Sequence, residues 1–72
     1  MNIPSRETIN QLRSRYPVGT RIELINMDDV RAPPMGTLGT VKGVDDMGSI
    51  MVHWDNGSSL NLIYNVDSCK KV

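Results

Sequence analysis

The chain has 72 residues, of which 39% are apolar and 22% are charged, and its 8 basic and 8 acidic side chains cancel. This length predicts one domain over residues 1–72, and the apolar content is too high for a disordered tail. No apolar run approaches the roughly 20 residues that cross a membrane. The numbers exclude a disulfide scaffold, a membrane protein and a large catalytic apparatus. Because no secretory segment precedes the first charged residues and Cys69 is the single cysteine, we expect a cytoplasmic protein.

The first predicted element is a helix over residues 5–16. It opens on a serine, which is a favoured N-cap residue. Ile9, Leu12 and Tyr16 recur at helical spacing and form one apolar stripe. The proline that follows disfavours helix and ends the element.

Beyond the helix the apolar spacing becomes alternating, which is typical of strands with one buried face. A long irregular loop over residues 26–36 separates the first two strands. In the second strand we expect Leu38, Val41 and Val44 to point inward, and in the third Trp54 is the largest core residue. The predicted strands cover residues 21–24, 37–44, 50–55, 59–63 and, as a short fifth strand, 69–72.

One helix followed by short strands with hairpin turns predicts a mainly β fold. Because a small sheet leaves few free edges only when it curls, we expect residues 18–72 to form a partly open antiparallel barrel of four or five strands. The predicted fold is therefore a small β-barrel with one N-terminal helix.

Two segments also resemble a known pattern. Gly36–Val41 reads Gly-Thr-Leu-Gly-Thr-Val and Val52–Gly57 reads Val-His-Trp-Asp-Asn-Gly, and both are similar to strands of Src-homology-3-like small barrels. Over nearly its whole length the chain resembles a family of short bacterial and phage proteins catalogued as a domain of unknown function. Further segments with this likeness are residues 4–7, 16–21, 32–34 and 67–69. The resemblance implies the barrel fold and a setting on phages or other mobile elements, and it implies no catalytic residues.

The residues that usually carry chemistry are too few for a recognisable catalytic or metal site. His53 is the single histidine, and it alternates away from the predicted core, so we expect no nucleophilic pair with Cys69. One histidine and one cysteine are too few for a structural zinc site. No phosphate-binding loop or other cofactor motif is present. We therefore predict no enzyme activity, no catalytic residues, no metal and no cofactor.

Two acidic stretches with neighbouring methionines are the first candidate partner-binding surface. The long loop and the turn after the second strand each hold a pair of aspartates, and long loops in small domains often carry function. If both stretches reach one end of the barrel, their charge and soft apolar groups suit a basic, amphipathic protein segment. An arrangement with the two pairs at opposite ends is equally open. The candidate residues are Met27, Asp28, Asp29, Met35, Asp45, Asp46 and Met47.

Basic residues form the alternative surface. Residues 1–21 carry four arginines and one glutamate, whereas residues 22–67 carry seven acids and two bases. If the helix and the last strand lie side by side, their basic side chains form a local patch that suits nucleic acid. This alternative basic face comprises Arg13, Arg15, Arg21, Lys70 and Lys71.

The sequence thus predicts a non-enzymatic binding or accessory module, with protein–protein interaction as the first hypothesis. A nucleic-acid-binding small barrel is one alternative. A phage or mobile-element factor that captures a host protein or a small signalling ligand is another. The identity of the partner and the oligomeric state stay open at this point.

Overall fold

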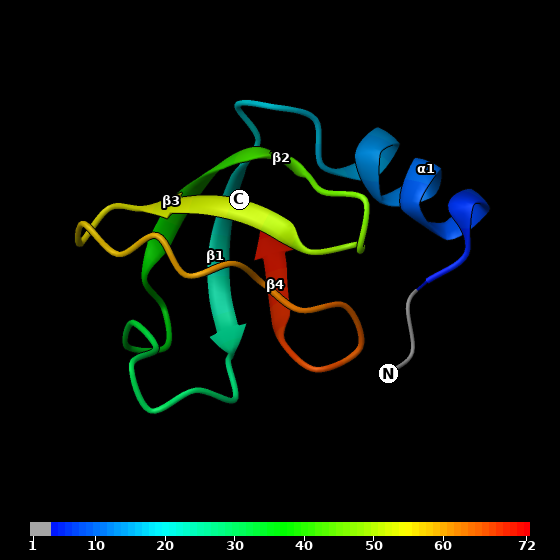
Figure 1. Ribbon diagram of the computed structural model, residues 1–72. Coiled ribbons are helices and arrows are strands. Elements are labelled where there is room, and N and C mark those ends of the chain that lie inside the picture. The colour runs from blue at the N-terminus through cyan, green and yellow to red at the C-terminus, as the bar shows by residue number, and fades with distance from the viewer. Residues whose placement is uncertain (1–3) are drawn as a thin grey trace.

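The computed structural model describes residues 4–72 and contains one helix and four strands (Figure 1). Residues 1–3 of the predicted domain lie outside the described residues. Within the described part of the chain, no helix is long and apolar enough to cross a membrane. The elements, in chain order, are α1 (Arg6–Arg15), β1 (Arg21–Asn26), β2 (Leu38–Val44), β3 (Ile50–Trp54) and β4 (Ser68–Lys71).

The predicted helix is confirmed as α1, with a capping residue at each end. The Ser5 hydroxyl accepts a hydrogen bond from the Thr8 amide at 3.1 Å, which satisfies one of the free donors of the first turn. At the other end the Tyr16 amide donates to the Leu12 carbonyl at 2.8 Å. Ile9 and Leu12 are buried, so the predicted apolar stripe faces the sheet.

All four strands pair antiparallel in the order β3-β2-β1-β4. The predicted fifth strand therefore exists as β4, and it lies beside β1, where Lys71 is the partner of Ile22 (Figure 1). In the part of the chain that the structure describes, no strand joins β4 to β3. The sheet is consequently not closed into a barrel, and the predicted closure is the part of the fold class that the structure does not contain.

The predicted strand over residues 59–63 is reduced to a single bridge. Leu62 pairs with Ile50 through two hydrogen bonds of 2.9 Å, and no further ladder forms along this segment. The Trp54 indole Nε1 donates to the Leu60 carbonyl at 2.8 Å. The Leu60 carbonyl thus accepts the hydrogen bond of the buried indole instead of one from a neighbouring strand. We take this as the reason that the segment does not form a regular strand.

The core is formed by the inner face of the sheet and the buried side of α1, and Trp54, which is 0% exposed, is its largest fully buried side chain. This confirms the predicted burial of Trp54. The other buried apolar residues come from α1, from β1, β2 and β3, and from the bridge segment. They are Ile9, Leu12, Tyr16, Ile22, Leu24, Val41, Val44, Ile50, Val52 and Leu62.

The predicted inward position of Leu38 is wrong. Leu38 is the register partner of Glu23 and is 38% exposed, and Gly39 takes the inward position opposite Ile22. Alternation is regular from Leu38 to Val41, so these two residues, three apart, face opposite sides of β2. The bulge between Val41 and Gly43 then lets Val44 share the core side with Val41.

Candidate functional site

The two predicted acidic stretches leave opposite ends of β2. The loop with Asp28 and Asp29 precedes β2, and the turn with Asp45 and Asp46 follows it. In Figure 1 the loop lies at the lower left and the turn lies at the right, near α1. The seven residues of β2 amount to about 20 Å of strand. The structure therefore does not bring the two pairs together, and each stretch is considered separately.

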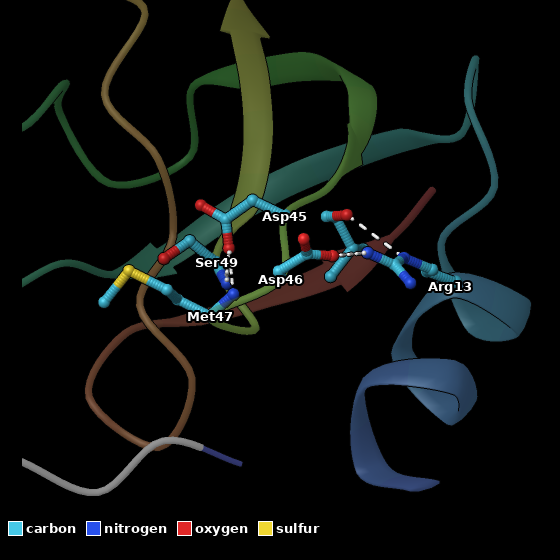
Figure 2. Close-up of polar contacts among 6 residues, drawn as sticks. Arg13, Asp45, Asp46, Met47 and Ser49 are labelled. Atoms are coloured by element: carbon cyan, nitrogen blue, oxygen red, sulfur yellow. Dashed lines mark hydrogen bonds and ion pairs between the residues drawn. The ribbon is translucent and has the colours of Figure 1, made fainter. Parts of the chain in front are cut away.

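The two carboxylates of the turn after β2 form hydrogen bonds within the turn and an ion pair with α1 (Figure 2). Asp45 Oδ1 accepts hydrogen bonds from the amides of Met47 at 3.0 Å and Ser49 at 2.9 Å. Asp46 forms an ion pair of 2.9 Å with Arg13. The same arginine donates through Nε to the Val44 carbonyl at 3.2 Å. The turn thus acts as a docking point for the helix.

The long loop before β2 is held by hydrogen bonds within the loop. Asp29 Oδ1 accepts from the Arg31 amide at 2.8 Å, and this hydrogen bond, with that of the Arg31 side chain, lowers the pKa of Asp29. The Ala32 amide donates to the Asp29 carbonyl at 3.0 Å. At the end of the loop the Thr37 hydroxyl donates to the Pro34 carbonyl at 2.6 Å. These contacts fix the backbone of the loop on both sides of its exposed tip.

Asp67 ties the long loop to the turn before β4. Its Oδ1 accepts from the Asp28 amide at 2.9 Å and its Oδ2 accepts from the Ile63 amide at 2.8 Å. Sequence reasoning did not assign Asp67 a role, because its two donors lie in segments far apart along the chain. The aspartate just before the last predicted strand was the only local signal. Asp67 thus places a carboxylate at the start of the long loop.

Apolar side chains are exposed on and beside this fixed loop. Val30 at its tip is fully exposed, and Met35 is 76% exposed. Ile25 and Leu38 flank the loop on the strands and are also exposed. Met27, by contrast, is partly buried and packs against the core. We name the following residues the loop surface: Ile25, Asp28, Asp29, Val30, Met35 and Leu38.

Three of the predicted basic residues are held by acids. Arg13 pairs with Asp46 as described, and Lys70 lies 3.9 Å from Glu23. Arg21 makes two contacts with Asp55, at 2.6 and 2.9 Å. Hydrogen bonding from Arg21 lowers the pKa of Asp55. Arg21 and Lys70 thus lie on the face of the sheet opposite the core, whereas Arg13 lies on α1.

The remaining two basic residues of the predicted face come together around one aromatic ring. The Arg15 guanidinium carbon is 5.6 Å and the Lys71 Nζ is 5.4 Å from the centroid of the Tyr16 ring. Both distances are within the range of cation–π attraction. Tyr16 also borders an open cleft of about 370 Å³, whose lining includes Leu62, Tyr64 and Cys69.

The structure places His53 and Cys69 on opposite faces of the sheet. His53 is exposed opposite Thr40, whereas Cys69 pairs with Leu24 on the core side and is half-buried. Burial raises the pKa of the Cys69 thiol, which keeps it protonated near neutral pH and weakens it as a nucleophile. Among residues 4–72 there is no group of three or more histidine, cysteine or acidic side chains arranged to hold a metal ion.

The sequence model of the family DUF4314, a domain of unknown function, matches residues 5–72. No curated protein matches the chain.

Proposed function

The chain belongs to the DUF4314 family, and we propose that it is a non-enzymatic module that binds another protein through the loop surface. The observation that carries the proposal is the full exposure of Val30 on a loop whose backbone is held by hydrogen bonds. A fixed loop loses little conformational entropy on binding, so the burial of its apolar side chains contributes more fully to affinity.

The charges beside the loop suggest what kind of protein segment it binds. The Asp67 carboxylate lies at the backbone amide of Asp28, next to Asp29 in the chain, and Arg31 is the one basic residue of the loop. A net negative surface beside exposed Val30 and Met35 suits a basic segment with apolar side chains. The same charge repels phosphates, which favours a protein over nucleic acid at this surface.

Two finer assignments belong to the same proposal. We infer a Src-homology-3-like fold, supported by the long first loop and by pairing of the last strand, β4, with the first, β1. We also infer that the protein acts in the bacterial cytoplasm and is encoded by a phage or another mobile element. The captured partner would then be a protein of the host. The sequence resemblance supports that setting.

Affinity capture from an extract of the native host tests the proposal. The bait is the wild-type chain, a variant with Val30→Ser and Met35→Ser, or the control Val18→Ser, which changes a valine that is 74% exposed outside the loop surface. Burial of a valine or methionine side chain contributes about 1.5–3 kcal/mol, so the double change is expected to reduce capture of the partner by at least about tenfold. The control is expected to capture as the wild type does.

Three results would contradict the proposal. One is equal capture by the loop variant and the wild type. Another is loss of capture when Arg13 and Arg15 are changed to glutamine while the loop variant stays active, which would place the working face on the helix. The third is recovery of nucleic acid, without protein, that disappears as salt is raised, which would favour the nucleic-acid alternative.

A further inference from the structure

We propose that the free edge of β4 accepts an extended acidic peptide segment as an additional strand of the sheet. This surface is separate from the loop surface, and the inference does not depend on the function proposed above. It rests on three features of β4: the direction of its backbone groups, the charge around it, and the cleft beside it.

The register determines which backbone groups of β4 face the free edge. The Val72 amide donates to the Arg21 carbonyl at 3.1 Å, so the backbone groups of Val72 face β1. In an antiparallel pair only every second residue of a strand bonds to the same neighbouring strand. Lys70, the partner of Glu23, is consequently bonded to β1. The N–H and C=O groups of Cys69 and Lys71 point to the other side, where no strand pairs with β4 within residues 4–72. Such a row of free donors and acceptors is a template for a further strand.

The charge around this edge selects the kind of strand. Lys70 and Lys71 lie on β4 itself, and Arg15 lies beside the Tyr16 ring that Lys71 also contacts. Glu23 lies 3.9 Å from Lys70 and offsets part of its charge. A second copy of β4 on this edge would bring lysines next to lysines, which is unfavourable. An acidic segment gains attraction from the same three cations.

The cleft of about 370 Å³ adjoins the core side of the edge. Ser68 and Cys69 of β4 line it together with Tyr16 and Tyr64. Because side chains of an added strand alternate between the two sides of the sheet, one side chain opposite Cys69 points toward the cleft. We therefore infer a segment with acidic side chains opposite Lys70 and Lys71 and an apolar side chain opposite Cys69.

The test uses a capped synthetic peptide, Val-Thr-Glu-Glu-Val-Thr, added to the uniformly ¹⁵N-labelled wild-type chain at up to about 1 mM. Amide hydrogen exchange is measured by NMR. In the free protein the Lys70 amide is expected to be protected and the amides of Cys69 and Lys71 to exchange faster. The peptide is expected to slow exchange at Cys69 and Lys71 and to leave Lys70 nearly unchanged, because only the first two face the added strand.

Two peptide controls separate strand pairing from charge attraction. Both keep the sequence and the charge of the parent peptide. One carries methyl groups on the odd-numbered backbone amides and the other on the even-numbered ones. A paired strand directs one phase toward β4 and the other away from it. We therefore expect one methylated peptide to bind like the parent and the other to lose at least about tenfold in affinity. Equal binding of the two methylated peptides would overturn the proposal.

Protein variants provide an independent measurement by fluorescence anisotropy. Lys71→Gln removes a charge and keeps the amide, whereas Lys71→Pro also removes the amide that faces the free edge. The first change is expected to weaken binding several-fold and to reduce its salt dependence, and the second to weaken it further. The variant with Val30→Ser and Met35→Ser is expected to bind the peptide like the wild type, which distinguishes this edge from the loop surface.

Three results would refute the inference whatever the stability of the proline variant. One is the absence of binding at about 1 mM peptide. Another is binding without slower exchange at Cys69 and Lys71. The third is self-association of the chain, in sedimentation experiments, that protects these two amides without peptide, because the edge would then bind a second copy.

Discussion

Gly39 and Trp54 explain at the scale of single residues why β2 turns Leu38 outward. A Cβ atom on Gly39 would lie 2.7 Å from Trp54 Cε3 and 2.8 Å from Val52 Cγ1. Both distances are shorter than real side chains tolerate, so the inward position opposite Ile22 accepts only glycine. The tryptophan therefore packs directly on the backbone of β2.

We predict that Gly39→Ala lowers the free energy of unfolding by about 1–3 kcal/mol, because the added methyl group overpacks the core. Urea denaturation measures the change. Val52→Ala removes one of the two contacted atoms, so the double variant with Gly39→Ala should lose less stability than the two single changes together predict. An alanine at position 39 without any cost, or strictly additive losses, would mean that this close approach is absent in solution.

The Arg21–Asp55 pair predicts a pH dependence with a definite sign. Hydrogen bonding from Arg21 lowers the pKa of Asp55 in the folded chain. The resulting stabilisation is present above the pKa of about 3.9 that the unfolded aspartate has, and it is lost as pH falls through the lower folded value. Between pH 5 and strongly acidic conditions, the wild type should therefore lose stability more steeply than Asp55→Asn.

Carbon-13 NMR titration of the Asp55 carboxyl checks this prediction directly. The midpoint in the wild type should lie below about 3.9, and Arg21→Gln should return it toward that value. A midpoint that is the same in both proteins would show that Arg21 does not control the carboxylate.

Residue-level prediction from the sequence succeeded where alternation was regular. Trp54 in β3 was assigned to the core from the alternating spacing, and it is fully buried. Leu38 was misassigned because it lies three residues before Val41, and regular alternation places two such residues on opposite faces. The bulge that lets Val41 and Val44 share the core side begins only after Val41. The clamp by Asp67 was missed because one of its donors, the Asp28 amide, is 39 residues away along the chain and meets the carboxylate only in the folded protein.

At the scale of elements, local signals were sufficient for α1 but not for the segment between β3 and β4. A cap, an apolar stripe and a following proline defined the helix to within one residue at each end. Residues 59–63 have the alternation of a strand, yet the indole of Trp54 takes the Leu60 carbonyl and one bridge remains. A tertiary hydrogen bond of this kind overrides local preference and is invisible in the sequence.

The clamp between the long loop and the turn before β4 gives a prediction at this scale. Asp67→Ala removes the acceptor of the Asp28 and Ile63 amides. We expect both amides to exchange faster with solvent and the free energy of unfolding to fall by about 1–3 kcal/mol. Asp46→Ala is the matched control, because that carboxylate is almost fully exposed and serves a different turn.

Amide exchange measured by NMR distinguishes the two variants. Asp46→Ala should leave the Asp28 and Ile63 amides as they are in the wild type. If Asp67→Ala also leaves them unchanged, the two segments are not joined through this carboxylate, and the long loop is less firmly held than the proposed function requires.

At the scale of the whole molecule, ion pairs between segments occupy several of the basic residues that the sequence offered as binding candidates. The chain has no net charge, and Arg13, Arg21 and Lys70 each lie beside an acid from another segment. The two acidic stretches are separated by β2, and the docking surface is proposed at the long loop, where exposed Val30 and Met35 lie on the same loop as Asp28 and Asp29. Sequence alone names the candidate residues, but the strand order decides which of them share a surface.

Site-specific photo-crosslinking in the native host is the most direct test of the central claim that the loop surface binds a protein. A photoreactive amino acid replaces Val30 in one bait and, as the control, Val18 in another; both positions are highly exposed. Mass spectrometry then identifies the adducts. We predict a protein adduct that forms at position 30 and is absent at position 18. Adducts at position 18 alone, or nucleic acid as the only product at position 30, would contradict the account.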